Sequence, residues 1–170
     1  SNTNGSYNNA FGNYALRLNT TGGGNSAFGD GALSSNTTGN KNSAFGARTL
    51  KVNGIGKGNS AFGYGALYYN TTNYNSAFGY YALRNNTTGW GNAAFGYIAL
   101  RNNTSGTGNS AFGHWALASN TTGYANNAFG IGALLANTSG FNNAAFGELS
   151  LASNTSGNNN SAVSYTHLRA

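Results

Sequence analysis

The feature that most constrains the fold of this chain is an internal repeat of 17 residues. The triplet Ala-Phe-Gly recurs along the sequence, and the spacing is 17 everywhere except between Phe62 and Phe78, where it is 16. The repeated residues are Phe11, Phe28, Phe45, Phe62, Phe78, Phe95, Phe112, Phe129 and Phe146, with Val163 at the next position. A repeat of this kind forms one structural unit that stacks on its copies, so the sequence predicts a solenoid.

Further positions are constant when the copies are aligned on Phe. The consensus is N-[S/A/N]-A-F-G-x-x-A-L-x-x-N-T-[T/S]-G-x-x, in which Asn stands three residues before Phe and again eight residues after it. Leu stands five residues after Phe. We expect these positions to form structural ladders of like residues, including Leu33, Leu67, Leu100, Asn25, Asn42, Asn59, Asn36 and Asn120.

The repeat predicts an all-β fold, a parallel β-solenoid or β-roll of about ten coils over residues 1–163. Helices are disfavoured because the 170 residues include 27 Gly and 31 Asn, which are poor helix formers. We expect two short extended segments per coil, one around Asn-Ser-Ala-Phe-Gly and one around Ala-Leu. The Asn-Thr-Thr-Gly segment has the composition of a turn. Equivalent residues would stack about 4.8 Å apart, which gives a rod of roughly 45 Å.

The predicted core is thin, since each coil offers one Phe, one Leu and a few small residues. We therefore expect a second surface to be buried by association of copies. In a strand, the Ala before Phe and the Gly after it share the face opposite Phe, and two small residues allow close backbone approach. The resulting hypothesis is a parallel homotrimer that packs this small-residue face near a shared axis.

Composition excludes several classes of function. Charged residues make up 6% of the chain, and Asp30 and Glu148 are the only carboxylate side chains. With His114 and His167 as the only histidines and no Cys, a zinc site of the usual ligand type and an ordinary hydrolase triad lack residues. We expect no enzyme activity, no cofactor and no metal. Lys and Arg are scattered singly and no apolar run is long enough to span a bilayer, so we expect neither nucleic-acid binding nor membrane insertion by this segment.

The motif Asn-Ser-Ala-Phe-Gly-x-x-Ala-Leu resembles the Asn-Ser-x-Ala-Ile-Gly-x-x-Ala repeat of the YadA-like heads of trimeric autotransporter adhesins. Its longer form, ending in Asn-Thr-Thr-Gly, is similar to arrays in phage tail-fibre and bacterial surface-fibre proteins. The present period is longer, and Phe replaces Ile. The resemblance covers residues 1–163 and implies a trimeric structural or attachment fibre that is extracellular, on a cell surface or on a virion. Residues 164–170 leave the pattern, and we interpret them as a non-native tail.

Variable positions supply the candidates for surface binding. Aromatic side chains on a polar surface suit contact with cell-surface glycans, although the same rings would also serve to pack chains together. The candidate residues are Tyr64, Tyr80, Tyr81, Trp90, Tyr97, Trp115 and Tyr124.

Two other interpretations concern the Asn-Thr-Thr segment. Asn-x-Ser/Thr triplets recur at the second Asn column and would be glycosylation acceptors in a eukaryotic secreted protein. Stacked Thr residues also suggest ice binding or another repeat-surface binding function. Adjacent Thr residues in a strand point to opposite sides, however, which is a poor arrangement for a flat binding face.

Overall fold

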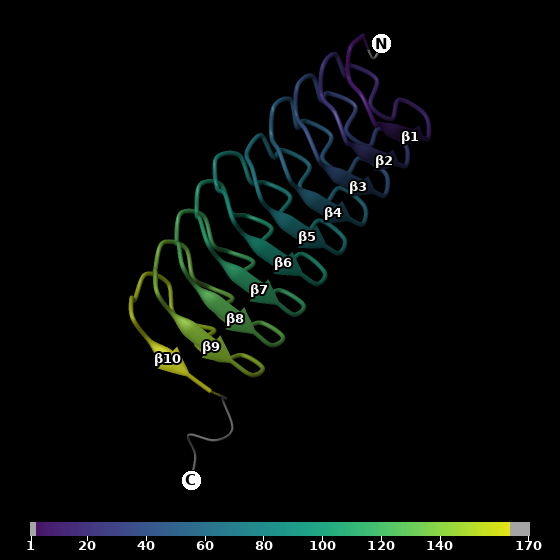
Figure 1. Cartoon of the computed structure of the whole chain (residues 1–170). Coiled ribbons are helices and arrows are strands. Elements are labelled where there is room, and N and C mark those ends of the chain that lie inside the picture. Colours follow the sequence, from purple (N-terminus) through teal and green to yellow (C-terminus); the bar gives the residue numbers. More distant parts are fainter. Residues whose placement is uncertain (1–2, 164–170) are drawn as a thin grey trace.

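The computed structural model describes residues 3–163 as a stack of similar coils, and each coil contributes one short strand to a single sheet (Figure 1). All strand pairs are parallel and follow the chain order, so the sheet runs along the stack from β1 to β10. The predicted β-solenoid of 17-residue coils is therefore confirmed. The strands are β1 (Asn9–Phe11), β2 (Ser26–Phe28), β3 (Ser43–Phe45), β4 (Ser60–Phe62), β5 (Ser76–Phe78), β6 (Ala93–Phe95), β7 (Ser110–Phe112), β8 (Asn127–Phe129), β9 (Ala144–Phe146) and β10 (Ser161–Ala162).

Equivalent residues of neighbouring coils are paired throughout the sheet. Phe28 pairs with Phe45, and Phe62 pairs with Phe78 even though the coil between them is one residue shorter. Backbone bonds between coils continue outside the strands, where Gly29 N donates to Phe11 O over 2.8 Å and Leu33 N donates to Thr49 O over 3.0 Å. The shortening thus falls in a turn and leaves the register of the coils intact.

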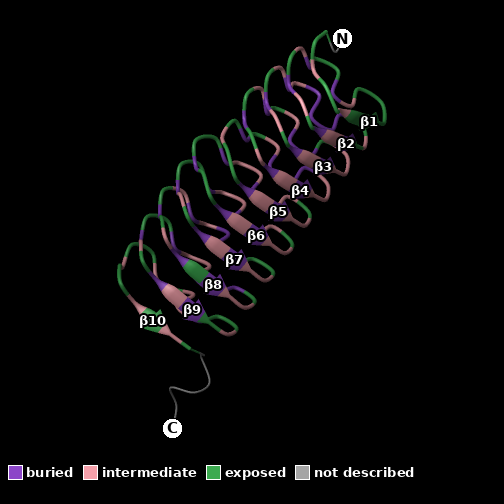
Figure 2. Cartoon of the chain, viewed as in Figure 1, coloured by how far each residue is buried: buried purple, intermediate pink, exposed green. Residues whose placement is uncertain are grey.

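Buried residues recur at corresponding places along the stack of coils (Figure 2). Over residues 3–163 these buried residues are Ala, Leu, Asn and Gly, with occasional Thr or Ser. Ala44 and Leu50 are fully buried, as are their equivalents in the other interior coils. Asn residues three before and eight after Phe are also fully buried in those coils. The core is therefore built from two small residues, one Leu and two amides per coil.

The Phe residues face outward, so the prediction that they fill the core is wrong. Ala44 has no exposed surface, whereas Phe45 beside it is half-buried and Phe28 is 38% exposed. Neighbouring residues of a strand point to opposite faces, and the coil places Ala inside and Phe outside. The small-residue face proposed for association is accordingly the interior of the coil and cannot contact another chain.

The second predicted extended segment is also wrong, because the Ala-Leu part of the coil forms turns. Leu33 has φ of +50°, in the left-handed region that a side chain with Cβ seldom adopts. Asn36 N donates to Leu33 O over 3.0 Å, and Ala32 N donates to Gly29 O over 3.2 Å. Each coil therefore has one strand followed by a series of tight turns that returns the chain to the next strand.

The Gly after Phe is required by both conformation and space. Gly46 has φ of +129°, and a Cβ placed on it would lie 2.7 Å from the carbonyl oxygen of Gly63 in the next coil. A side chain at this position would push neighbouring coils apart. The column of glycines thus lets the backbones turn at the distance that the sheet imposes.

Two predictions about other parts of the chain concern the tail and the membrane. Residues 164–170, which we interpret as a non-native tail, lie outside the described residues. Over residues 3–163 the structure has no helix with the length and apolar character needed to cross a bilayer.

Candidate functional site

A column of stacked Phe rings runs along the outside of the sheet from β2 to β9, and we call it the Phe stripe. Between Phe45 and Phe62 the ring centroids lie 4.7 Å apart, and the ring planes differ by 3°. Similar stacking continues to Phe146, where the last centroid distance is 5.2 Å. The ring faces contact each other, so the stripe presents ring edges to its surroundings. The stripe consists of Phe28, Phe45, Phe62, Phe78, Phe95, Phe112, Phe129 and Phe146.

The buried Asn columns form two continuous hydrogen-bonded ladders. In the second column, Asn36 Nδ2 donates to Asn19 Oδ1 over 2.7 Å and to Gly39 O over 3.0 Å. In the first column, Asn42 Nδ2 donates to Asn25 Oδ1 over 3.1 Å and to a glycine carbonyl over 2.8 Å. Outside the short coil, these amides donate to the equivalent Asn of the preceding coil, as Asn103 does to Asn86 and Asn109 does to Asn92. These Asn residues therefore satisfy buried polar groups and hold the coils together.

This geometry decides the interpretation of the Asn-x-Ser/Thr triplets. The Asn120 amide is fully buried, and its Nδ2 donates to Asn103 Oδ1 over 2.8 Å and to Gly123 O over 2.9 Å. A glycan on Nδ2 would need the space occupied by these partners. The triplets thus follow from the ladder, and the folded coil leaves no room for a sugar there.

The short coil joins the two Asn ladders. Its turn lacks the glycine of the other coils, and Thr72 O accepts from Asn59 Nδ2 over 2.7 Å and from Asn70 Nδ2 over 2.9 Å in its place. Asn75 Nδ2 then donates to Asn70 Oδ1 over 3.0 Å, which links one ladder to the other. The sequence shows the missing residue but not this exchange of partners.

The Thr columns differ in their surroundings. Thr37 Oγ1 donates to Gly54 O over 3.0 Å, and Thr121 Oγ1 donates to Thr138 O over 3.0 Å, so the first hydroxyl of each pair bonds the next coil. The second residue, as in Thr38 and Thr122, is exposed. The first residue is exposed as well in some coils, as in Thr87 and Thr104, but its hydroxyl donates to a carbonyl of the next coil. The pair therefore does not offer two rows of unbonded hydroxyls to an ice surface.

Five of the seven predicted surface residues lie together in an aromatic ridge that follows the strands. Tyr80 stacks between Tyr64, at 5.6 Å, and Tyr97, at 5.4 Å. Tyr81 packs against Tyr80 with a centroid distance of 4.2 Å, and its side-chain hydrogen bond is the main cause that raises the pKa of Tyr80 above its usual value. The ridge ends at Trp115, which is 42% exposed.

The other two predicted residues lie elsewhere, in the loops that precede the strands. Trp90 is 60% exposed, and Tyr124 stacks on Phe141 with centroids 4.7 Å apart and planes differing by 4°. They do not form one surface with the aromatic ridge, because the ridge residues follow their strands. The structure thus separates the candidate glycan-contacting residues into two groups.

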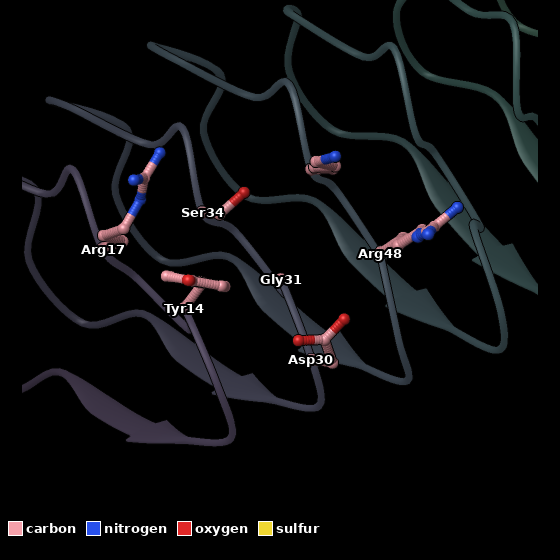
Figure 3. A pocket seen from close by; sticks show the side chains of 7 residues that line it. Tyr14, Arg17, Asp30, Gly31, Ser34 and Arg48 are labelled. Carbon is pink, nitrogen blue, oxygen red and sulfur yellow. The ribbon is translucent and has the colours of Figure 1, made fainter.

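The structure has a hollow around Gly31 that the sequence does not predict, and we call it the Gly31 pocket (Figure 3). It has a volume of about 220 Å³. The only signal for it in the sequence is a Gly at a position where neighbouring coils carry Tyr14 and Arg48. The residues around Gly31 are Tyr14, Arg17, Asp30, Ser34, Arg48 and Lys51.

Among residues 3–163, His, Asp and Glu side chains do not gather into a group of three that would hold a metal ion. The residues of the surface features are instead aromatic, hydroxyl-bearing and basic. Such side chains suit binding and packing. No protein-family profile, no curated protein and no solved structure matches the chain.

Proposed function

We propose that this chain is a non-enzymatic structural segment of a fibre on a virion or a bacterial surface, such as a phage tail fibre or an adhesin. In this proposal, parallel copies associate into a trimer through their Phe stripes. The rod serves as a spacer, and its outer surface serves for attachment to a host or a glycan. The chain needs no cofactor for these roles.

The observation that carries the proposal is the exposed edge of the Phe stripe. Its interior rings remain half-buried, so each leaves on the order of 50 Å² of apolar surface in contact with solvent. Together the six interior rings expose on the order of 300 Å². This is the size of the largest apolar patch on a typical monomer, and such patches are often functional. A stable interface usually takes about 800 Å² from each partner, so the columns that flank the stripe would contribute the remainder.

The chemistry of the flanking columns favours association of like chains. The residue two before Phe lies on the same face and is small and uncharged, as in Ser43, Ser60 and Ala93. A second copy in parallel presents the same ring spacing of about 4.7 Å, so its rings match the periodicity of the first stripe over its full length. Such matching favours a parallel arrangement over a crossed one.

The interior supports the role of a spacer. Each coil bonds its neighbour through the backbone, through both Asn ladders and, in most coils, through a Thr hydroxyl, as in Asn103, Asn109 and Thr104. Repetition of these bonds in every coil favours a straight, stiff rod whose length is set by the number of coils. The aromatic ridge, with its Tyr hydroxyls and Trp115, is the proposed contact surface for cell-surface glycans.

The test of association is a variant that removes the central part of the Phe stripe. Replacing Phe62, Phe78, Phe95 and Phe112 by Ser leaves the buried Ala and Asn columns unchanged, so we expect far-UV circular dichroism to be retained. Sedimentation equilibrium should then show trimers for the native chain and monomers for the variant. A matched control replaces Tyr80 and Tyr97 of the ridge by Ser and should remain trimeric.

Two results would contradict the association proposal: a native chain that is monomeric at micromolar concentration, or a stripe variant that remains trimeric. Attachment has a separate test. Replacing Tyr81 and Trp115 by Ala should reduce binding to glycan-coated surfaces without changing the oligomeric state. If binding is unchanged, the aromatic ridge is not the contact surface.

A further inference from the structure

We propose that the Gly31 pocket binds an acidic sugar, such as a uronic acid unit of a polysaccharide. The inference rests on the attachment role proposed above and gives that role a ligand class and a second location. It does not depend on association, because the pocket follows strand β2 and the Phe stripe is formed by the strands themselves.

The pocket exists because the residue three positions after Phe lacks a side chain at Gly31. The same position is also Gly in two other coils, at Gly65 and Gly132. A Cβ on Gly65 would lie 2.6 Å from the ring of Tyr81, and a Cβ on Gly132 would lie 2.8 Å from the side chain of Leu149. A Cβ on Gly31 would meet no atom within 4 Å. Two of the three gaps are thus filled by the next coil, and the third remains available to a ligand.

The size of the pocket selects a small ligand. Its volume of about 220 Å³ is below the range of roughly 300–1,000 Å³ for pockets that hold drug-sized molecules. A single six-membered sugar ring is an occupant of suitable size. The surface position of the pocket, in the wall of a rod, allows the rest of a polysaccharide chain to continue outside it.

The charges around the pocket select an anion. Arg17, Arg48 and Lys51 contribute three positive charges against the one negative charge of Asp30. Aromatic rings hold these basic side chains, since Arg48 Cζ lies 5.9 Å from the Tyr64 ring centroid and Lys51 Nζ lies 5.5 Å from that of Tyr68. Cation–π contacts position a basic group without neutralising its charge, so Arg48 and Lys51 remain able to bind a carboxylate.

Asp30 discriminates between an acidic sugar and a simple anion. Its carboxylate lies at the edge of the pocket, on the side away from Arg17, and Ser34 lines the opposite wall (Figure 3). The Asp30 carboxylate repels any anionic group placed beside it, so the anionic group of a ligand must lie toward the basic side chains. The same carboxylate accepts hydrogen bonds from sugar hydroxyls, which a simple anion lacks. The combination of basic groups, a carboxylate and a hydroxyl in one ring-sized hollow therefore matches a ligand that carries both an anionic group and a polyol.

The experiment compares three probes with the full chain: methyl glucuronide, methyl glucoside and inorganic phosphate. Isothermal titration and saturation-transfer NMR at low ionic strength should show binding of the glucuronide and at least about tenfold weaker binding of the neutral glucoside, since a charge-assisted hydrogen bond is lost. Phosphate should bind weakly and should not compete. If phosphate binds as well as the glucuronide, or if the glucoside binds equally, the proposal is overturned.

Two variants localise the binding. Gly31→Tyr fills the pocket with a side chain that the same column already holds at Tyr14 and Tyr81, so the coil should fold and glucuronide binding should disappear. The double variant Arg48→Gln with Lys51→Gln leaves the pocket open and should weaken binding about tenfold or more. Its matched control, Lys41→Gln with Lys57→Gln, removes the same charge from the loops before the strands and should bind normally.

Retained binding in the Gly31→Tyr variant, or equal losses in the two double variants, would overturn the assignment to this pocket. Sedimentation of the same samples separates this outcome from failure of the proposed association. A trimer that does not bind glucuronide contradicts only the present inference, whereas a monomer that binds it contradicts only the trimer.

Discussion

Removal of one amide from a buried Asn ladder should cost more stability than the loss of any exposed side chain. Asn103 is fully buried, and its Nδ2 donates to Asn86 Oδ1 over 2.8 Å and to Gly106 O over 2.9 Å. Its Oδ1 accepts from Asn120 Nδ2 over 2.8 Å. Asn103→Ala removes all three bonds and leaves Asn86 Oδ1 without its side-chain donor.

The expected cost follows from these contacts. An orphaned buried acceptor costs about 1–3 kcal/mol, and the other two lost bonds contribute about 1 kcal/mol each, so we expect a destabilisation of about 3–5 kcal/mol. The matched control is Asn102→Ala. Asn102 is half-buried, and its Oδ1 accepts one long bond of 3.3 Å from Asn85. The control should change stability by less than about 0.5 kcal/mol.

The assay is urea unfolding followed by far-UV circular dichroism, combined with amide hydrogen exchange along the coils. Repeat proteins can unfold in sections, so exchange shows whether the loss of protection centres on the coils beside Asn103. The ladder would lose its assigned role if Asn103→Ala cost less than about 1 kcal/mol or no more than Asn102→Ala. Protection that decreased equally in every coil would contradict the local origin of the effect.

Three further predictions test the same architecture. Asn103→Asp should be less stable at pH 8 than at about pH 4, because burial raises the folded-state pKa of the new carboxyl above its unfolded value of about 3.9. Stability is then lost as the pH rises from the unfolded pKa to the folded pKa, and melting temperatures that do not fall with rising pH would contradict this. Gly96→Ala should lower the unfolding free energy in urea by more than about 3 kcal/mol, because φ is +140° and the new Cβ would lie 2.5 Å from Gly113 O. At Gly91, φ is +67° and an added Cβ would meet no atom within 4 Å, so Gly91→Ala should cost about 1 kcal/mol. Equal costs would show that the glycine column is not closely packed. Insertion of one Gly after Thr72 should change the unfolding free energy by less than about 1 kcal/mol, because it restores the turn that the other coils contain; loss of the folded circular-dichroism spectrum would show that the short coil is required.

The sequence predicts the coil and its register because both depend on spacing alone. Constant distances between the Phe, Leu and Asn positions require that each 17-residue unit closes on the same path, and the single interval of 16 still aligns Phe62 with Phe78. The Asn ladders follow from the same argument, since an amide repeated at the axial spacing has an identical amide above and below it. Spacing contains no information, however, about which face of the strand lies inside.

The side of the strand that faces inward is where the sequence-based prediction fails. Phe is the largest apolar residue of the strand, so hydrophobicity alone predicts it in the core, but two small residues, one Leu and two amides already occupy the interior of each coil. A usable signal was present in the variation between copies. The position before Phe is always Ala, whereas the position before that is Ser, Asn or Ala, as in Ser43, Asn127 and Ala144. Variable positions tolerate solvent, and alternation then places Phe on the outer face with them.

Backbone geometry accounts for the other differences. A Leu at φ near +50° in coil after coil is not expected from its intrinsic preferences, so the sequence predicts an extended segment at Ala-Leu where the structure has turns. The Gly31 pocket depends on whether the side chain of the next coil bends into a gap, as Tyr81 and Leu149 do and Arg48 does not. Such rotamer choices between coils cannot be obtained from a repeat alignment.

The one-way direction of the Asn amides has a consequence for how such rods change in length. Each coil offers its successor the same acceptors that it uses in its predecessor, as Asn36 does between Asn19 and Asn53. Duplication or loss of a whole unit therefore creates no mismatched junction. Gain or loss of one repeat in the gene therefore changes the length of the rod by one coil, about 4.8 Å, and leaves its cross-section unchanged.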